Sequence, residues 1–256
     1  MTALPARRLE GRLVLVTGIG RRGQVGEAVA KAFLENGDRV VVVAHSAEEA
    51  EERAADLGGS VSNVFPFAAD LANARDVERL ARDVRAAHGS RVHAVVHLAG
   101  GWMQGAPIAE STDAYWERSI AANLMTAAYT ARAFIPAVRE ARGAFVFFAS
   151  EAALPGASVG GMAAYAAAKQ GVVAVARALA QEEARNGVRS NALAPGSIRT
   201  ASNEAAMGAD AAYVEREEVA ATVLWLCSDA ASAVTGEVIR LKARRRAAGG
   251  QGTTGE

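Results

Sequence analysis

Residues 13–26 read Leu-Val-Leu-Val-Thr-Gly-Ile-Gly-Arg-Arg-Gly-Gln-Val-Gly, an apolar run followed by a glycine-rich turn. The apolar run has the length and β-branched content of a buried strand. The segment from Val25 to Asn36 is typical of a helix, and Gly37 is expected to close it. Backbone N–H groups at such a strand-to-helix turn can hold a pyrophosphate. The stretch therefore predicts a nucleotide-binding turn, although a tight turn also needs glycine without a ligand.

The rest of the chain repeats this alternation of short apolar runs with longer segments of helical period. Strands are predicted at 40–44, 64–67, 92–98, 144–149 and 238–241, and helices at 47–57, 74–88, 113–139, 163–185 and 217–228. Regular alternation of this kind is typical of right-handed crossovers in a parallel sheet. We predict a doubly wound α/β fold, a single Rossmann-type domain over residues 1–243 with about seven strands and helices on both faces. The polar end, residues 244–256, is expected to be a disordered tail.

Composition excludes several classes of protein. The 256 residues carry 28 basic and 28 acidic side chains, so the net charge is zero. Nucleic-acid and anionic-membrane binding depend on an excess of Lys and Arg, so we expect neither partner. No apolar run approaches the roughly 18 residues of a membrane span, and the first residues lack a signal-peptide core. We expect a cytoplasmic protein that binds a small molecule.

No metal site is expected. His93 and His97 lie four residues apart in a predicted strand, where that separation spans roughly 13 Å. They therefore cannot share one metal ion. The single cysteine, Cys227, has apolar neighbours and is predicted to be a buried thiol.

The end of the second predicted strand bears on the choice of cofactor. Many dinucleotide-binding sheets place an acid there, which binds the adenosine ribose. This chain has His45 and Ser46 instead, while Arg21 and Arg22 lie in the glycine-rich turn, where a guanidinium can pair with a 2′-phosphate. The pattern favours NADP over NAD, with NAD the alternative if both arginines are ordinary solvent-facing residues.

Tyr165 and Lys169 are predicted to lie on one face of a helix, because they are four residues apart. A nearby ammonium favours the phenolate, so Lys169 is expected to lower the pKa of Tyr165 and make it a proton donor and acceptor. This spacing also occurs by chance on many helices. However, Ser150 ends a predicted strand, and the stretch 191–200 is predicted to be a turn beside the same crevice, where open α/β sheets bind ligands.

These motifs, in this order, resemble the short-chain dehydrogenases/reductases over nearly the whole chain, from Leu9 to about Leu241. Asn123, Ser150, Tyr165 and Lys169 match the family's catalytic tetrad. With the arguments above, the resemblance gives this set of cofactor-binding residues: Gly18, Arg21, Arg22, Gly23, Val25, His45, Ser46, Asp70, Leu71, Ala99, Gly100, Tyr165, Lys169, Pro195, Gly196, Ile198 and Thr200.

The resemblance implies hydride transfer between a nicotinamide and a carbonyl or alcohol carbon. Tyr165 would exchange the proton, Ser150 would bind the substrate oxygen, and Lys169 would hold the nicotinamide ribose. Asn123 would position a water molecule that relays the proton. Substrate contacts are expected from Trp102, Ser150 and Tyr165.

The chain departs from the family pattern in places. The glycine-rich loop is two residues longer than usual, and His97-Leu98 stands where Asn-Asn is usual. The turn at 99–102 and the short stretch before residue 218 are similar to the dihydropteridine-reductase branch, whose members in general lack the serine found here at Ser150. That branch is one alternative, with Trp102 either stacking on a planar substrate or packing at the sheet end.

The sequence is also compatible with two further functions. One is a Rossmann protein without catalytic activity that senses a nucleotide; the other is an isomerase, epimerase or dehydratase with a tightly held cofactor. The Ala-rich predicted helices at 113–139 and 163–185 permit close helix packing, as in family members that form dimers and tetramers. We therefore expect a homo-oligomer, either a tetramer or a dimer.

Overall fold

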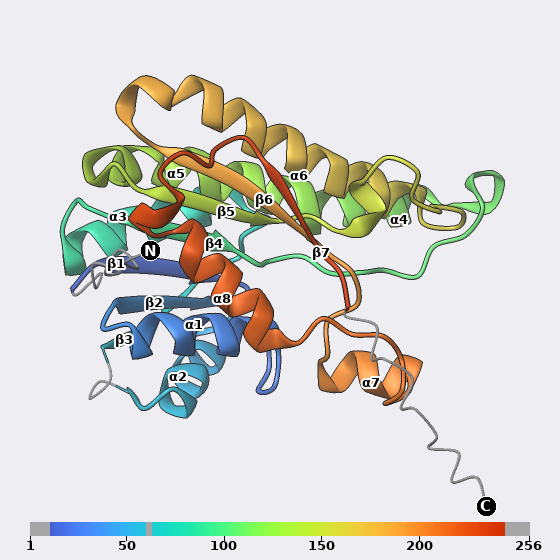
Figure 1. Ribbon diagram of the computed structural model, residues 1–256, viewed down its shortest axis with the longest axis horizontal. Coiled ribbons are helices and arrows are strands. Elements are labelled where there is room, and N and C mark those ends of the chain that lie inside the picture. Colours follow the sequence, from blue (N-terminus) through green and yellow to red (C-terminus); the bar gives the residue numbers. More distant parts are fainter. Residues whose placement is uncertain (1–10, 60–62, 244–256) are drawn as a thin grey trace, which may run out of the picture.

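The computed structural model describes residues 11–59 and 63–243 (Figure 1). Within these residues, seven parallel strands form one sheet in the order β3-β2-β1-β4-β5-β6-β7. The strands are β1 Leu13–Thr17, β2 Arg39–Ala44, β3 Val64–Ala68, β4 Ala94–His97, β5 Ala144–Phe148, β6 Arg189–Pro195 and β7 Val238–Leu241. The predicted doubly wound α/β fold is confirmed. The predicted tail at 244–256 lies outside the described residues.

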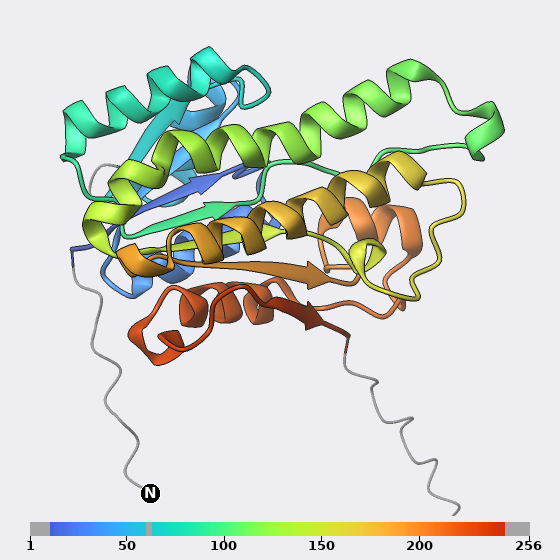
Figure 2. The same ribbon diagram turned by 90° about the horizontal axis from the view of Figure 1, so that it is seen from above.

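Helices cover both faces of the sheet (Figures 1 and 2). The helices are α1 Val25–Glu35, α2 Ala47–Asp56, α3 Ala74–His88, α4 Asp113–Ile120, α5 Thr126–Ala141, α6 Ala163–Glu182, α7 Ala201–Met207 and α8 Arg216–Leu226. Helices α1, α2 and α8 contribute to the apolar core on one face of the sheet, while α3, α5 and α6 build the core on the other. No helix within the described residues is long and apolar enough to cross a membrane.

The structure corrects the sequence prediction at three places. Residues 189–195 form a buried strand, β6, so the turn predicted over 191–200 begins only after Pro195. Residues 201–207 form α7, which was not predicted. The helix predicted over 113–139 is interrupted by a π-helical turn, η3, at Ala121–Met125. Such turns are rare and often occur at functional sites, and this one holds Asn123.

Close backbone contact at Gly26 sets the position of α1 against the end of β1. A Cβ atom on this glycine would lie 2.3 Å from the carbonyl oxygen of Ile19. Ile19 is buried and part of the core beneath α1. The absence of a side chain at position 26 thus allows α1 to start directly over the glycine-rich turn.

Gly26→Ala is expected to lower the free energy of unfolding by about 1–3 kcal/mol, because the methyl group must displace the Ile19 backbone. Urea denaturation measures this loss. Gly160→Ala is the matched control, since a Cβ at that position meets nothing within 4 Å. Equal unfolding midpoints for the two variants would contradict the role given to Gly26.

Candidate active site

The candidate active site lies at the edge where the parallel strands end. Thr17 of β1 is in register with His97 of β4, and His97 is in register with Phe147 of β5. Phe148 is in register with Leu193 of β6, two residues before that strand ends. The predicted convergence of these strand ends is therefore present, and the arrowheads of β6 and β7 point to this edge in Figure 2.

The glycine-rich turn has the geometry of a phosphate-binding loop. Gly18, Gly20 and Gly23 all have left-handed backbone conformations, with φ of 67°, 70° and 79°. A Cβ on Gly18 would lie 2.4 Å from the backbone nitrogen of Ala99, so the two turns touch. The side chain of Gln24 does not cap α1, so N–H groups of the helix N-terminus remain for an anion, although the Glu27 carboxylate accepts from the Gly23 N–H at 2.5 Å. This turn thus fits the pyrophosphate of a dinucleotide.

The residues predicted to bind the adenosine end lie around this turn. Arg21, Arg22, His45 and Ser46 are exposed. Among the described residues, no carboxylate forms an ion pair with either arginine. The Ser46 hydroxyl accepts a hydrogen bond from the backbone N–H of Glu49 at 3.2 Å and so caps α2. The exposed guanidinium groups are free to bind an added phosphate.

Asp70 and Leu71 occupy the turn after β3. The carboxylate of Asp70 accepts a hydrogen bond from the backbone N–H of Ala72 at 2.9 Å, which orders the turn. Both residues are partly buried. Asp70 is therefore fixed at the same edge of the sheet as the glycine-rich turn.

Asn123 is fully buried in the π-helical turn η3. Its side-chain oxygen accepts from the Gly101 N–H at 3.0 Å, while its amide group donates to the carbonyls of Gly101 at 3.2 Å and Ser119 at 3.1 Å. A Cβ on Gly100 would lie 2.6 Å from the Asn123 oxygen, so only glycine fits there. The Asn123 side chain thus links the turn after β4 to the helix that carries Asn123 through hydrogen bonds.

Ser150, Tyr165 and Lys169 meet between β5 and α6. Ser150 follows the end of β5, while Tyr165 and Lys169 lie in the first two turns of α6. The Lys169 ammonium is buried and donates to the carbonyl of Phe148 at 2.8 Å. The same nitrogen lies 6.0 Å from the centre of the Tyr165 ring. Three of the four predicted catalytic side chains thus share one small region.

The predicted lowering of the Tyr165 pKa is wrong. Burial raises the pKa of this phenol, and its hydrogen bond with Ser150 only partly opposes the rise. Burial also lowers the pKa of Lys169 to about 8, so the ammonium is still charged at neutral pH. The difference has a physical reason, because Lys169 directs its nitrogen at the Phe148 carbonyl while the phenol is taken out of water.

The segment after β6 closes the other side of the site. Pro195 ends β6, Ile198 forms an isolated parallel bridge with Val214, and Thr200 is buried and caps α7 through the Asn203 N–H. A Cβ on Gly196 would lie 3.0 Å from a carboxylate oxygen of Glu151. This group of predicted cofactor-binding residues is therefore at the carboxyl edge of the sheet.

Sequence reasoning missed two charged residues at this edge. Glu151 follows Ser150 and forms an ion pair with Arg240 at 2.7 Å, which links the β5 loop to β7. Arg216 begins α8, and its guanidinium lies 3.6 Å from the Cβ position of Gly23. Glu151 has a local signal, because it directly follows Ser150, whereas Arg216 has none, because α8 brings it to the site from a distant part of the sequence.

Comparisons with known proteins agree with this geometry. The sequence profile of a family described as Enoyl-(Acyl carrier protein) reductase matches residues 18–242. The chain belongs to the short-chain dehydrogenase/reductase family. It is 34% identical over 241 residues to a D-threitol dehydrogenase of Mycolicibacterium smegmatis, with 90% of each chain covered.

Another relative is a 2,5-dichloro-2,5-cyclohexadiene-1,4-diol dehydrogenase of Sphingobium indicum, 31% identical over 90% of this chain and 95% of its own. The solved structure of a short-chain type dehydrogenase/reductase from Mycobacterium ulcerans is also similar, at 30% identity and a TM-score of 0.80. The match covers 91% of this chain and 88% of that one. The protein is thus an oxidoreductase of a family that uses NAD(P).

His97 forms a buried link beneath the active site of this short-chain dehydrogenase/reductase. The Thr126 hydroxyl donates to the Ala122 carbonyl at 2.9 Å, so it accepts from His97 Nε2 at 3.2 Å. The other ring nitrogen, Nδ1, then accepts from the Thr17 hydroxyl at 2.9 Å. Burial and the charge of Lys169 lower the pKa of His97 to about 3, so the ring stays neutral. His97 therefore ties β1 to the helix that carries Asn123.

His97→Ala is expected to lower the free energy of unfolding by about 2–5 kcal/mol, because it leaves a cavity and removes a hydrogen-bond partner from two buried hydroxyls. Urea denaturation provides the measurement. His45→Ala, at an exposed position, is the control and should unfold like the parent protein. An unchanged midpoint for His97→Ala would show that the buried link contributes nothing to stability.

Proposed function

We propose that this protein is an NADP(H)-dependent short-chain oxidoreductase that transfers hydride between the nicotinamide and a carbonyl or alcohol substrate. Tyr165 acts as the general acid and base. The observation that carries the proposal is the meeting of Ser150, Tyr165 and Lys169 at the strand edge that also holds the glycine-rich turn. A protein that only senses a nucleotide has no need of this buried group.

Three residues of the chain would have distinct roles in this reaction. When bound, NADP(H) supplies or accepts the hydride. Ser150 hydrogen-bonds the substrate oxygen and holds it beside the Tyr165 hydroxyl, which donates a proton in reduction and accepts one in oxidation. Lys169 is a cation at neutral pH and would donate hydrogen bonds to the hydroxyl groups of the nicotinamide ribose.

Asn123 contributes to this reaction mainly by holding the turn after β4 in place. Both hydrogens of its side-chain amide bind backbone carbonyls, so it cannot also donate to a water molecule. We propose that its side chain fixes the turn at Gly101 beside the site, while its backbone carbonyl accepts from the buried Thr126 hydroxyl at 3.4 Å.

The substrate side is expected to be open. Trp102 is 58% exposed and Met207 is 52% exposed. The exposure of Trp102 favours a role in stacking on the substrate over a role in packing. Because two relatives act on a polyol and a cyclic diol, the first substrates to test are D-threitol and cyclic diols, with a quinonoid dihydropteridine included. We also propose a cytoplasmic homo-oligomer that packs through α4, α5 and α6.

Tyr165→Phe is expected to reduce turnover by a factor of 100 to 10,000 while cofactor affinity stays unchanged, because only the proton-transfer group is lost. In the parent protein the raised pKa of Tyr165 keeps the phenol protonated through neutral pH. Oxidation of the alcohol needs the phenolate, so its rate should rise as the pH is raised from 7, until Lys169, with a pKa of about 8, loses its charge. Carbonyl reduction uses the protonated form, so its rate should not rise. Initial rates in both directions measure these profiles.

Tyr129→Phe provides the matched control, since this tyrosine lies on α5 against Arg132 and away from the proposed proton transfer. It should retain full activity. Full activity of Tyr165→Phe on every substrate that the parent protein converts would overturn the proposed mechanism.

Arg21→Ala/Arg22→Ala is expected to weaken NADPH binding about tenfold or more and leave NADH binding nearly unchanged, since only NADPH carries the 2′-phosphate. Fluorescence titration of both cofactors tests this. Arg75→Ala/Arg79→Ala removes the same charge from α3 and should alter neither affinity. Equal loss of NADH and NADPH binding would contradict the proposed selectivity for NADP.

A further inference from the structure

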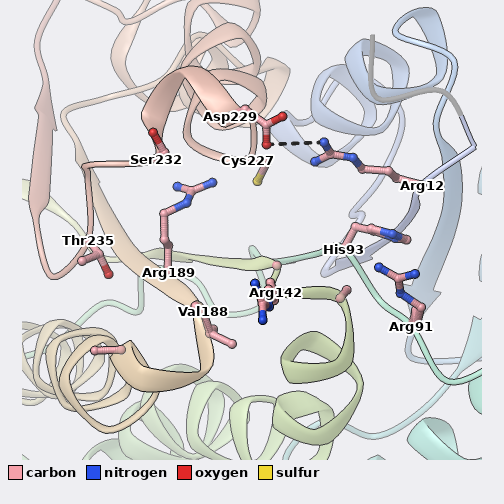
Figure 3. Close-up of a pocket in the computed structure, with 14 residues that line it drawn as sticks. Arg12, Arg91, His93, Arg142, Val188, Arg189, Cys227, Asp229, Ser232 and Thr235 are labelled. Atoms are coloured by element: carbon pink, nitrogen blue, oxygen red, sulfur yellow. Dashed lines mark ion pairs between the residues drawn. The ribbon is translucent and has the colours of Figure 1, made fainter. Parts of the chain in front are cut away.

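A cavity of about 710 Å³ lies at the opposite edge of the sheet, where the strands begin (Figure 3). Its walls come from the segments that lead into four neighbouring strands, β1, β4, β5 and β6, and from the chain after α8. None of the residues predicted to bind cofactor or substrate lines it. The cavity is thus separate from the candidate active site.

Arginine dominates the charge of this cavity. Four arginines line it, Arg12, Arg91, Arg142 and Arg189, against one carboxylate, Asp229. In Figure 3, Arg12 and Arg91 lie on one side, Arg189 on the other and Arg142 between them. The whole chain has equal numbers of acidic and basic residues. The cavity is therefore a local concentration of positive charge in a neutral protein.

Two of the arginines have structural partners. Arg12 lies 3.5 Å from Asp229, and its charge also opposes the rise in pKa that burial causes at Asp38. Arg189 donates to the carbonyls of Leu226 and Ser228 near the end of α8. These two positions are held by contacts within the protein.

The other two arginines lack such partners. Arg91 and Arg142 are exposed, and neither forms an ion pair with any carboxylate in residues 11–59 and 63–243. Their guanidinium groups keep most of their donors available. They are the natural groups to bind an added anion in this cavity.

The backbone at Arg142 fixes the place of its side chain at the cavity. This residue closes α5 with φ 52°, a left-handed conformation that glycine adopts at lower cost. Its side chain lies beside Gly187, where a Cβ would be 3.5 Å from the Arg142 Cδ. The closing hydrogen bonds of α5, from the Arg142 N–H to the Arg139 carbonyl and from the Gly143 N–H to the Val138 carbonyl, account for this conformation. They hold the Arg142 side chain along the cavity wall.

Neutral hydrogen-bond donors complete the wall. His93 Nδ1 accepts from the Leu13 N–H at 3.1 Å, so in the neutral ring the proton is on Nε2, which can donate. The hydroxyl groups of Ser232 and Thr235 also line the cavity, and that of Thr235 accepts from the Ser190 N–H. The cavity therefore combines planar cations with neutral donors.

We infer that this cavity is a binding site for a small molecule with a polyphosphate group, held chiefly by Arg91 and Arg142. Guanidinium groups match phosphate oxygens in pairs, so several arginines in one hollow favour phosphate over a single carboxylate. The volume is that of a small-molecule pocket. A nucleotide and inorganic polyphosphate share this chemistry. The inference is independent of the proposed function, because it concerns the other edge of the sheet.

Calorimetric titration of the full chain with tripolyphosphate tests the site. Arg91→Ala/Arg142→Gly removes both unpaired cations, and glycine suits the backbone at position 142. This variant should bind tripolyphosphate about tenfold more weakly or worse, and the parent protein should lose affinity when salt is raised. Its melting temperature should not fall, which separates ligand binding from a merely structural role.

Two charge-matched controls locate the binding. Arg75→Ala/Arg79→Ala removes two exposed charges from α3 and should leave the affinity unchanged. Arg21→Ala/Arg22→Ala tests the glycine-rich turn, which is the proposed pyrophosphate site. Loss of binding in the turn variant with full binding in Arg91→Ala/Arg142→Gly would overturn the inference, as would no binding to the parent protein at 1 mM tripolyphosphate, roughly the limit of a useful affinity.

A parallel titration with ATP separates the two sources of polyphosphate. Only the portion of binding lost in Arg91→Ala/Arg142→Gly is assigned to the cavity. If ATP binds there more tightly than tripolyphosphate, the site takes a nucleotide; equal affinities identify the polyphosphate alone as the recognised group. Either result supports the site, whereas retention of all binding of both probes in this variant excludes it.

Discussion

The contact between the Lys169 ammonium and the Phe148 carbonyl constrains the whole carboxyl edge of the sheet. A buried cation is costly unless a polar group faces it, and this carbonyl lies 2.8 Å away. The contact joins the first turns of α6 to the end of β5, which places Tyr165 beside Ser150. A Cβ on Gly171, two residues after Lys169, would lie 2.8 Å from the side chain of Leu124. The helix can therefore approach the turn that holds Asn123.

The Lys169 ammonium also affects the protonation of its neighbour His97. His97 is fully buried and its pKa is lowered by burial and by Lys169, so a second positive charge does not form beneath the site. The neutral ring can then accept from Thr17 and donate to Thr126. Burial, with the nearby charge of Lys169 as the smaller cause, thus explains why a histidine at this position serves as a neutral link between a strand and a helix.

Apolar strands could be predicted from the sequence, and polar ones could not. The apolar run at the start of residues 13–26 predicted β1, because all five residues of this strand are apolar or β-branched. In contrast, β6 contains Ser190, Asn191 and Pro195, which normally argue against a buried strand. The turn at 234–237 satisfies the Asn191 side chain, which donates to the Val234 carbonyl and accepts from the Glu237 N–H, while the buried Ser190 hydroxyl has no partner among the described residues. This compensation depends on tertiary contacts that the sequence pattern does not show. At the site, the spacing of Tyr165 and Lys169 correctly placed them on one helix face. The direction in which each pKa shifts depends on burial, which the spacing does not show.

Parallel topology also explains how two edges of one sheet acquire different chemistry. Each arginine of the cavity lies just before or at the start of a strand, and those strands are neighbours in the sheet although their arginines are far apart in sequence. All parallel strands begin at one edge, so four isolated arginines become one group only when the sheet forms. Like charges repel, and two of them have no carboxylate partner within the described residues. An anion that joins Arg91 and Arg142 relieves that repulsion, and it does so at the edge of the sheet away from hydride transfer.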